Sequence, residues 1–175
     1  MNKYVRATVS LVAVQAVLLG GYLLVGERRG SAAGAQAPEI IALPLPDLVV
    51  RYADGSSGNV ADLRGQPILL HFWATWCPPC RDELPGLLAL AEGERMRVLL
   101  VALDKDWGPV RRFLDATVPA SIALADGNEV ERLFGVHELP ETFVVDHTGS
   151  MTLRFRGGRD WTTAATLDLL PQEIR

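Results

Sequence analysis

The sequence contains few of the residues that bind metals or haem. Among its 175 residues only five side chains are cysteine or histidine: Cys77, Cys80, His71, His137 and His147. A structural zinc site takes four ligands, usually from paired Cys or Cys/His sets, and one cysteine pair with scattered histidines does not supply such a set. Covalent haem attachment takes C-x-x-C-H, and residue 81 is arginine. Both kinds of site are therefore disfavoured.

The sequence also has no internal repeat, no low-complexity tract and no excess of basic residues. Residues 1–37 hold four of the 17 basic and one of the 21 acidic residues, which leaves 13 basic against 20 acidic in residues 38–175, a net charge of −7. An acidic domain repels the phosphate backbone of nucleic acids. We therefore expect no nucleic-acid partner.

One long hydrophobic run is present, from Ala7 to Gly26, and it is uncharged. Twenty helical residues at about 1.5 Å each cover about 30 Å, the thickness of a bilayer's hydrocarbon core. We interpret residues 7–26 as a transmembrane signal anchor, with residues 1–6 in the cytoplasm. The Gly- and Ala-rich residues 27–37 are predicted to form a flexible tether, and residues 38–175 an exported domain.

A cleaved secretory signal and a buried globular helix are the two alternatives for this run. A cleaved signal has a shorter apolar segment and a small-x-small cleavage site close behind it. Here the nearest such triplet, Ala35-Gln36-Ala37, lies beyond a charged cluster and is followed by Pro38. A buried globular helix would need a polar face, which the run lacks. An uncleaved anchor is the favoured interpretation.

Strand-like and helix-like segments alternate after the tether. Strands are expected at residues 48–52, 58–60, 67–74, 96–103, 142–146 and 151–156, and helices at residues 78–92, 107–116, 128–134 and 160–170. The run 67–74 is almost entirely apolar, as in a strand buried on both faces. The order predicts an α/β fold with a mixed central sheet flanked by helices.

Cys77 and Cys80 fall where the buried strand 67–74 ends and a helix begins. A helix start presents unpaired N–H groups and the positive end of the macrodipole, so a sulfur there is stabilised as thiolate. This position favours a redox-active dithiol. A metal-binding pair and an inert disulfide are the alternatives, although a disulfide closing a four-residue ring gains little loop-closure entropy.

Three segments resemble a known family. The stretch FWATWCPPCRDELP (72–85), the lead-in ADLRG (61–65) and FGVHELPETFVVDHTG (134–149) are similar to the thioredoxin superfamily, and within it to the TlpA/ResA/DsbE (CcmG-like) branch of membrane-anchored thiol:disulfide oxidoreductases. The resemblance covers most of residues 38–170. It implies a thioredoxin-like fold, no bound cofactor and a redox-active Cys77–Cys80 disulfide, with Cys77 as nucleophile and Cys80 as resolving thiol.

The residues around the cysteines carry further expectations. Pro78 and Pro79 have no N–H, so Cys80 supplies the nearest backbone donor to the Cys77 sulfur. Fewer donors mean a less stabilised thiolate, which predicts a reductant rather than a disulfide donor. Glu83 lies three residues after Cys80 on the same helix face and matches an active-site acid of ResA-like proteins. The alternative for Glu83 is a solvated first-turn acid.

Other positions are assigned to proton transfer, substrate binding or packing. His71 is a candidate proton relay for Cys80, or a hydrogen-bonded core histidine. Leu139-Pro140 resembles the family's cis-proline loop, with Pro140 beside the dithiol and the Leu139 backbone pairing with substrate. Trp76 is expected to form an apolar lip over the site, with Pro78 and Pro79 beside it. Three other tryptophans are assigned to packing: Trp73, Trp107 and Trp161.

The function expected is a disulfide reductase facing the periplasm or cell exterior. By resemblance, its clients would be apocytochrome c or a copper-site assembly protein, and its electrons would come from a membrane thiol transporter of the DsbD or CcdA type. The alternative is a metallochaperone that binds Cu(I) through both cysteine thiolates, with His137 as a further ligand.

Overall fold

A computed structural model describes residue 15 and residues 36–93, 97–115 and 117–171. The chain divides into a unit ending at Ala33 and a second unit, residues 34–175. The predicted cytoplasmic segment 1–6, the anchor 7–26 apart from Gln15, and the tether up to residue 35 lie outside the described residues. Within the described part, no helix combines the length and apolar composition that a bilayer crossing needs.

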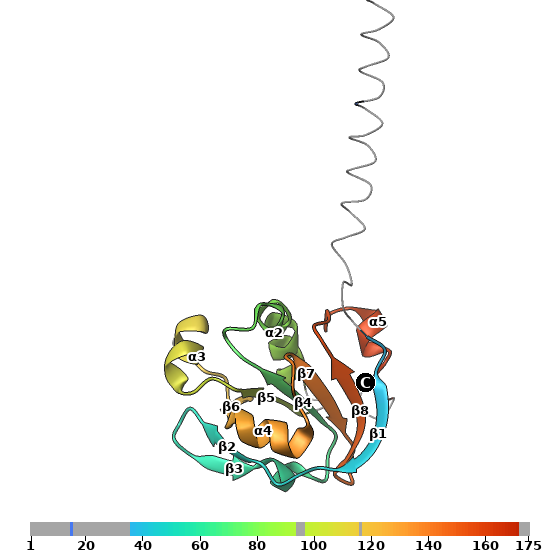
Figure 1. Cartoon of the computed structure of the whole chain (residues 1–175), viewed down its shortest axis with the longest axis horizontal. Coiled ribbons are helices and arrows are strands. Elements are labelled where there is room, and N and C mark those ends of the chain that lie inside the picture. Colours follow the sequence, from blue (N-terminus) through green and yellow to red (C-terminus); the bar gives the residue numbers. More distant parts are fainter. Residues whose placement is uncertain (1–14, 16–35, 94–96, 116, 172–175) are drawn as a thin grey trace, which may run out of the picture. The chain divides into compact units, whose positions relative to one another are not determined.

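Eight strands of the described chain form one mixed sheet (Figure 1). Across the sheet the strands are β1 (Glu39–Pro44), β8 (Ser150–Arg156), β7 (Glu141–Val145), β4 (Ile68–Trp73), β5 (Arg97–Ala102), β6 (Ile122–Leu124), β2 (Val49–Tyr52) and β3 (Ser57–Asn59). Strands β4, β5 and β6 are parallel, and the other neighbours pair antiparallel. The predicted α/β fold with a mixed sheet is confirmed.

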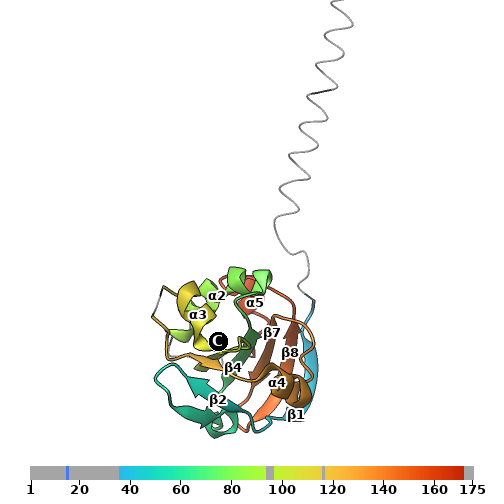
Figure 2. The ribbon, with the colours of Figure 1, turned by 60° about the vertical axis from the view of Figure 1, so that its left-hand side comes forward.

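Helices cover both faces of the sheet (Figures 1 and 2). The helices are α2 (Pro78–Ala91), α3 (Trp107–Phe113), α4 (Gly127–Phe134), α5 (Ala164–Leu167) and the short 3₁₀-helix η1 (Val60–Leu63). Leu84 and Leu87 of α2 join one hydrophobic cluster, together with Val110 of α3. Val130 and Phe134 of α4 join a second cluster on the opposite face. The sheet therefore separates two cores.

Strand β4 lies between these cores, and all six of its residues are buried. Because side chains alternate along a strand, Leu69 and Trp73 enter the α2 cluster while Leu70 and Phe72 enter the α4 cluster. His71 alternates with Leu70 and Phe72 and therefore faces the α2 side. The apolar run that predicted a strand buried on both faces is confirmed.

The structure corrects several predicted elements. The helix expected over residues 160–170 is wrong, since only α5 is helical there. The Asp160 carboxylate accepts hydrogen bonds from the Thr162 N–H and hydroxyl, and the Thr163 hydroxyl caps α5. Such local side-chain bonds compete with helix formation. Helix α3 ends at Phe113, before the predicted residue 116.

Strands β1 and β6 were not predicted. Strand β1 is mostly exposed on both sides, so its sequence shows no alternation of apolar and polar residues. Strand β6 has three residues, too few for a pattern.

Truncating a buried phenylalanine of β7 tests the packing of the α4 core. The ring of Phe143 is 1% exposed and lies 6.0 Å and 5.7 Å, centroid to centroid, from those of Phe72 and Phe134. We expect Phe143→Ala to lower the free energy of unfolding by about 3–5 kcal/mol. The control is Phe113→Ala, whose ring is 37% exposed, with an expected loss of about 1 kcal/mol. Equal losses in denaturant unfolding would contradict this description of the core.

Candidate active site

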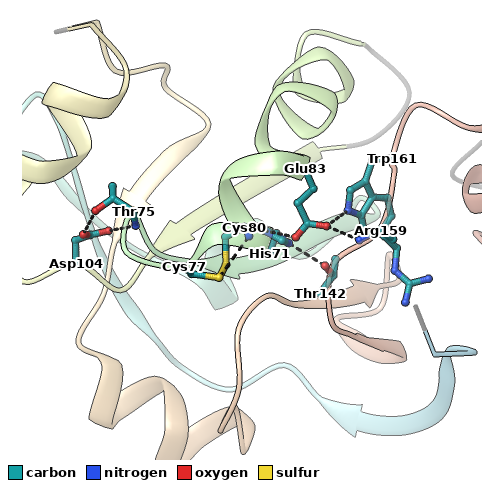
Figure 3. The surroundings of a disulfide bond; sticks show 9 residues. All are labelled: His71, Thr75, Cys77, Cys80, Glu83, Asp104, Thr142, Arg159 and Trp161. Carbon is teal, nitrogen blue, oxygen red and sulfur yellow. Dashed lines mark hydrogen bonds and ion pairs between the residues drawn. A yellow bond between two sulfur atoms is a disulfide. The ribbon is translucent and has the colours of Figure 1, made fainter. Parts of the chain in front are cut away.

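Cys77 and Cys80 form a disulfide at the start of α2 (Figure 3). Cys77 is the N-cap residue, and Pro78 and Pro79 occupy the first two helical positions. The Cys80 N–H donates to the Cys77 sulfur over 3.4 Å. The prediction that Cys80 supplies the backbone donor nearest to this sulfur is therefore confirmed.

The two sulfurs differ in accessibility. Cys77 keeps 5% of its surface exposed and Cys80 has none. Around Cys77, Trp76 is 67% exposed, and Pro78 and Pro79 are also exposed. Cys77 therefore keeps a small exposed surface next to three exposed apolar residues, Trp76, Pro78 and Pro79. Cys80 faces the interior.

The strand-to-helix loop before Cys77 is held by the end of β5. The buried Asp104 carboxylate accepts hydrogen bonds from the Thr75 N–H at 3.0 Å and the Thr75 hydroxyl at 2.6 Å. Thr75 lies two residues before Cys77, so this contact fixes the direction in which the chain enters α2. No motif in the sequence identified Asp104.

Glu83 is buried on the inner side of the disulfide (Figure 3). Its Oε2 accepts hydrogen bonds from the backbone N–H of Arg159 and from Nε1 of Trp161, each at 3.0 Å. Burial raises the pKa of Glu83 to about 7, against the lowering effect of these two bonds and of the Arg159 charge. The alternative interpretation of Glu83 as a solvated acid is wrong.

His71 extends from β4 toward the same carboxyl group. Its Nδ1 lies 2.8 Å from Oγ1 of Thr142, the residue opposite it on β7. Its Nε2 lies 3.4 Å from Glu83 Oε1. Burial lowers the pKa of His71 to about 3, so its imidazole is neutral in the ordinary pH range. The structure places the candidate relay against the candidate acid.

The Leu139–Pro140 peptide bond is cis, as the resemblance predicted. The Pro140 carbonyl accepts a hydrogen bond from the Gly157 N–H at 3.0 Å. A methyl group added at Gly158 would lie 3.2 Å from the Pro79 side chain and 4.0 Å from that of Pro140. The cis-proline loop and the first turn of α2 therefore adjoin, with Gly158 against both. Leu139 is half-buried beside them.

His137, the further copper ligand in the metallochaperone interpretation, is exposed. Its Nδ1 lies 3.2 Å from Glu131 Oε1. Within residues 36–93, 97–115 and 117–171, no three His, Cys, Asp or Glu side chains are grouped to hold a metal ion.

Besides Thr75 and Asp104, the sequence interpretation missed the three residues that bind His71 and Glu83: Thr142, Arg159 and Trp161. Trp161 was assigned to packing, but its indole N–H is a hydrogen-bond donor to Glu83. The indole N–H of a buried tryptophan usually has a hydrogen-bond acceptor, so burial of Trp161 could have predicted a polar partner. No feature of the sequence near Arg159 predicts that its backbone N–H donates to the carboxylate of Glu83, 76 positions away.

Comparisons with known proteins agree with this geometry. The profile of the AhpC/TSA family matches residues 34–154. The thiol-disulfide oxidoreductase ResA of Geobacillus thermodenitrificans is 30% identical over 160 residues, which cover 86% of this chain and 85% of that protein. ResA of Bacillus thuringiensis subsp. konkukian is 31% identical over 118 residues, 64% of this chain and 67% of that protein. A crystal structure assigned as the thiol:disulfide interchange protein DsbE of Chlorobium tepidum superposes with a TM-score of 0.65 at 27% identity and covers 77% of this chain and 97% of that one.

Removing the Glu83 charge is expected to change how stability depends on pH. Because the folded-state pKa of Glu83 is raised from 4.5 to about 7, its contribution to stability is complete below pH 4.5 and is lost as the pH rises through about 7. The loss is about 3 kcal/mol. Glu83→Gln lacks this titration. As the pH rises from below 4.5 to above 7, the free energy of unfolding of Glu83→Gln should therefore increase relative to that of the wild type by about 3 kcal/mol.

Denaturant unfolding of the full-length disulfide form across this pH range measures the difference. The matched control is Glu138→Gln, which removes an exposed carboxylate. A constant difference between Glu83→Gln and the wild type would show that the pKa of Glu83 is not raised.

Proposed function

Because this chain belongs to the AhpC/TSA family and is a thiol-disulfide oxidoreductase of the ResA/DsbE type, we propose that it reduces disulfides of client proteins outside the cytoplasm. The observation that carries the direction is the helix start around Cys77. Two of the amides that would solvate a thiolate there are missing, because residues 78 and 79 are prolines, and the Cys80 N–H, 3.4 Å from the Cys77 sulfur, is the nearest backbone donor that remains. A weakly stabilised thiolate makes the reduced form a better electron donor.

The proposed reaction moves two electrons from the dithiol to the client. The Cys77 thiolate attacks one sulfur of the client disulfide, that S–S bond breaks, and the first client sulfur leaves as a thiolate that takes up a proton. Cys80 then loses its proton and attacks Cys77. The mixed disulfide breaks, the second client thiolate leaves, and the Cys77–Cys80 disulfide is formed. The client is reduced and this protein is oxidised.

Glu83 is the proposed proton acceptor for Cys80. Cys80 has no exposed surface, so its proton must pass to a group inside the protein before its sulfur can attack. Glu83 is buried one helical turn along α2. A carboxyl group with a pKa of about 7 is suited to accept and return a proton at neutral pH. His71, whose Nε2 faces Glu83, extends this path as the proposed relay.

The client is proposed to bind along the exposed surface beside Cys77. Trp76, Pro78 and Pro79 offer apolar contact without charge, and the Leu139 backbone would pair with an extended client segment. Pro140 would keep that segment close to the sulfur. This arrangement suits unfolded or extended clients, because main-chain pairing selects an extended strand.

The proposed setting is the outer face of the bacterial cytoplasmic membrane, with residues 7–26 as the anchor. The uncharged length of that segment supports the anchor. A role in cytochrome c maturation or respiratory-complex assembly is proposed from the family that the sequence motifs resemble. Apocytochrome c or a copper-site assembly protein is the proposed client. A membrane thiol transporter of the DsbD or CcdA type would re-reduce the disulfide, and no bound cofactor is required.

The reduction potential of the Cys77/Cys80 pair tests the direction. We expect a value of about −250 mV or below in equilibrium with glutathione, in the range of reductants. A value of about −120 mV, typical of strong oxidants, would contradict the proposal. Pro79→Ala, which restores one amide near the Cys77 sulfur, should raise the potential. Pro85→Ala, at an exposed position later in α2, is the matched control and should leave the potential unchanged.

Trapping separates the roles of the two thiols and identifies clients. Cys80→Ser should accumulate mixed disulfides through Cys77 in the native membrane, because the resolving thiol is absent. Cys77→Ser, the matched control, should accumulate far fewer, since Cys80 has no exposed surface. Mass spectrometry of the adducts measures both. Equal trapping by the two variants would contradict the assignment of Cys77 as nucleophile.

A further inference from the structure

The contact between His71 and Glu83 brings together two buried polar atoms that lack hydrogen bonds. His71 Nε2 and Glu83 Oε1 are 3.4 Å apart, yet neither forms a hydrogen bond to the described residues. The other polar atom of each side chain is engaged: Nδ1 with Thr142 and Oε2 with Arg159 and Trp161. A buried polar atom without a partner is unfavourable. A proton between Nε2 and Oε1 would satisfy both atoms.

Which atom holds that proton depends on whether Glu83 is ionised. When Glu83 is protonated, its O–H can donate to a bare Nε2, and the neutral ring then carries its own proton on Nδ1. When Glu83 is ionised, a bare Nε2 would place a lone pair against the carboxylate. The ring relieves this only by carrying its proton on Nε2, which then donates to Oε1. The two states of Glu83 therefore require opposite tautomers of His71.

Thr142 is able to serve both tautomers. Its hydroxyl lies 2.8 Å from Nδ1 and can accept from Nδ1–H or, after rotation, donate to a bare Nδ1. Thr142 lies opposite His71 in the pairing of β4 with β7, so the sheet fixes this distance. A carbonyl at this position could not serve both tautomers, because it only accepts hydrogen bonds.

We propose that His71 and Thr142 form a tautomer switch that hydrogen-bonds Glu83 in both of its protonation states. His71 and Thr142 are positioning residues in this scheme, which rests on the proposed role of Glu83 in proton transfer. The switch lets Glu83 take up and release the Cys80 proton without leaving a buried atom unpaired. The groups facing Glu83 are His71 from β4, Cys80 from its own helix, and Arg159 and Trp161 from the segment after β8.

Nitrogen NMR of the full-length chain tests the switch directly. The disulfide form is used, because its cysteines do not titrate. The ¹⁵N shifts of an imidazole distinguish a protonated from a bare ring nitrogen, and the absence of a signal in His71→Leu assigns His71 among the three histidines. We expect Nδ1–H well below the Glu83 pKa of about 7 and Nε2–H well above it. One tautomer throughout, or a doubly protonated ring at the lower pH, would overturn the proposal.

Two substitutions should move the pKa of Glu83 in opposite directions. The ¹³C shift of the Glu83 carboxyl group, recorded against pH, measures this pKa. His71→Leu removes the partner of Oε1, which disfavours the carboxylate more than the acid, so the pKa should rise by about one unit. Thr142→Val leaves Nδ1 without a partner. Since a buried N–H without a partner is rarer than a buried acceptor without one, the ring should keep its proton on Nε2 and the Glu83 pKa should fall.

Three comparisons complete the test. Thr142→Ser keeps the hydroxyl and should restore the wild-type titration, while Thr152→Val removes a strand hydroxyl from β8 and should not shift it. Shifts of the same sign in His71→Leu and Thr142→Val, or none in either, would overturn the switch. If His71→Leu does not fold, substitution of the exposed His137 and His147 assigns the His71 signals by elimination, and the Thr142 variants and the wild-type ¹⁵N shifts decide. None of these readouts uses catalytic activity, so Glu83 could lack its role with Cys80 and the switch would still be measured.

Discussion

The burial of one carboxyl group organises this site. Glu83 brings three separate parts of the chain together, since its oxygens face His71 of β4 and accept hydrogen bonds from Arg159 and Trp161 after β8. A carboxylate inside a protein is strongly unfavourable unless it is hydrogen-bonded or protonated. The fold provides two donors, but burial outweighs them and raises the pKa of Glu83 to about 7, so its proton is held more tightly than that of a free glutamic acid. The group that ties these segments together is therefore also one that titrates near neutral pH.

The start of α2 lacks two backbone donors, whereas Glu83 has two. An ordinary helix N-terminus has four free amides to stabilise an anion, but Pro78 and Pro79 remove two of them beside Cys77. Proline is well tolerated in the first helical turn, so the helix itself is not weakened. The sequence thus removes two donors from beside Cys77 without disturbing the scaffold, which the contact between Thr75 and Asp104 holds in place.

Sequence alone predicts those parts of the site whose chemistry is local. The cysteines, the prolines between them and the cis-proline loop are short motifs, and β4 is marked by its apolar run. What the sequence does not show is the set of donors around Glu83, because the pairing of β4 with β7 and a loop after β8 determine it. The helix predicted over residues 160–170 was wrong for a different, local reason. The apolar spacing was present, but the Asp160 side chain formed a turn with Thr162 instead.

In the proposed reaction the two sulfurs take part in different steps and need different surroundings, and a single helical turn supplies both. Cys77, at the N-cap position, keeps 5% of its surface exposed, and this is where the proposed client would meet its sulfur. Cys80, three residues later, points to the interior and shares a helix face with Glu83. An exposed Cys80 could lose its proton to water, and Glu83 would then have no part in its activation. Because Cys80 has no exposed surface, its release of a proton would depend, in the proposed reaction, on the buried Glu83 carboxyl group and on the contacts that set the pKa of that group.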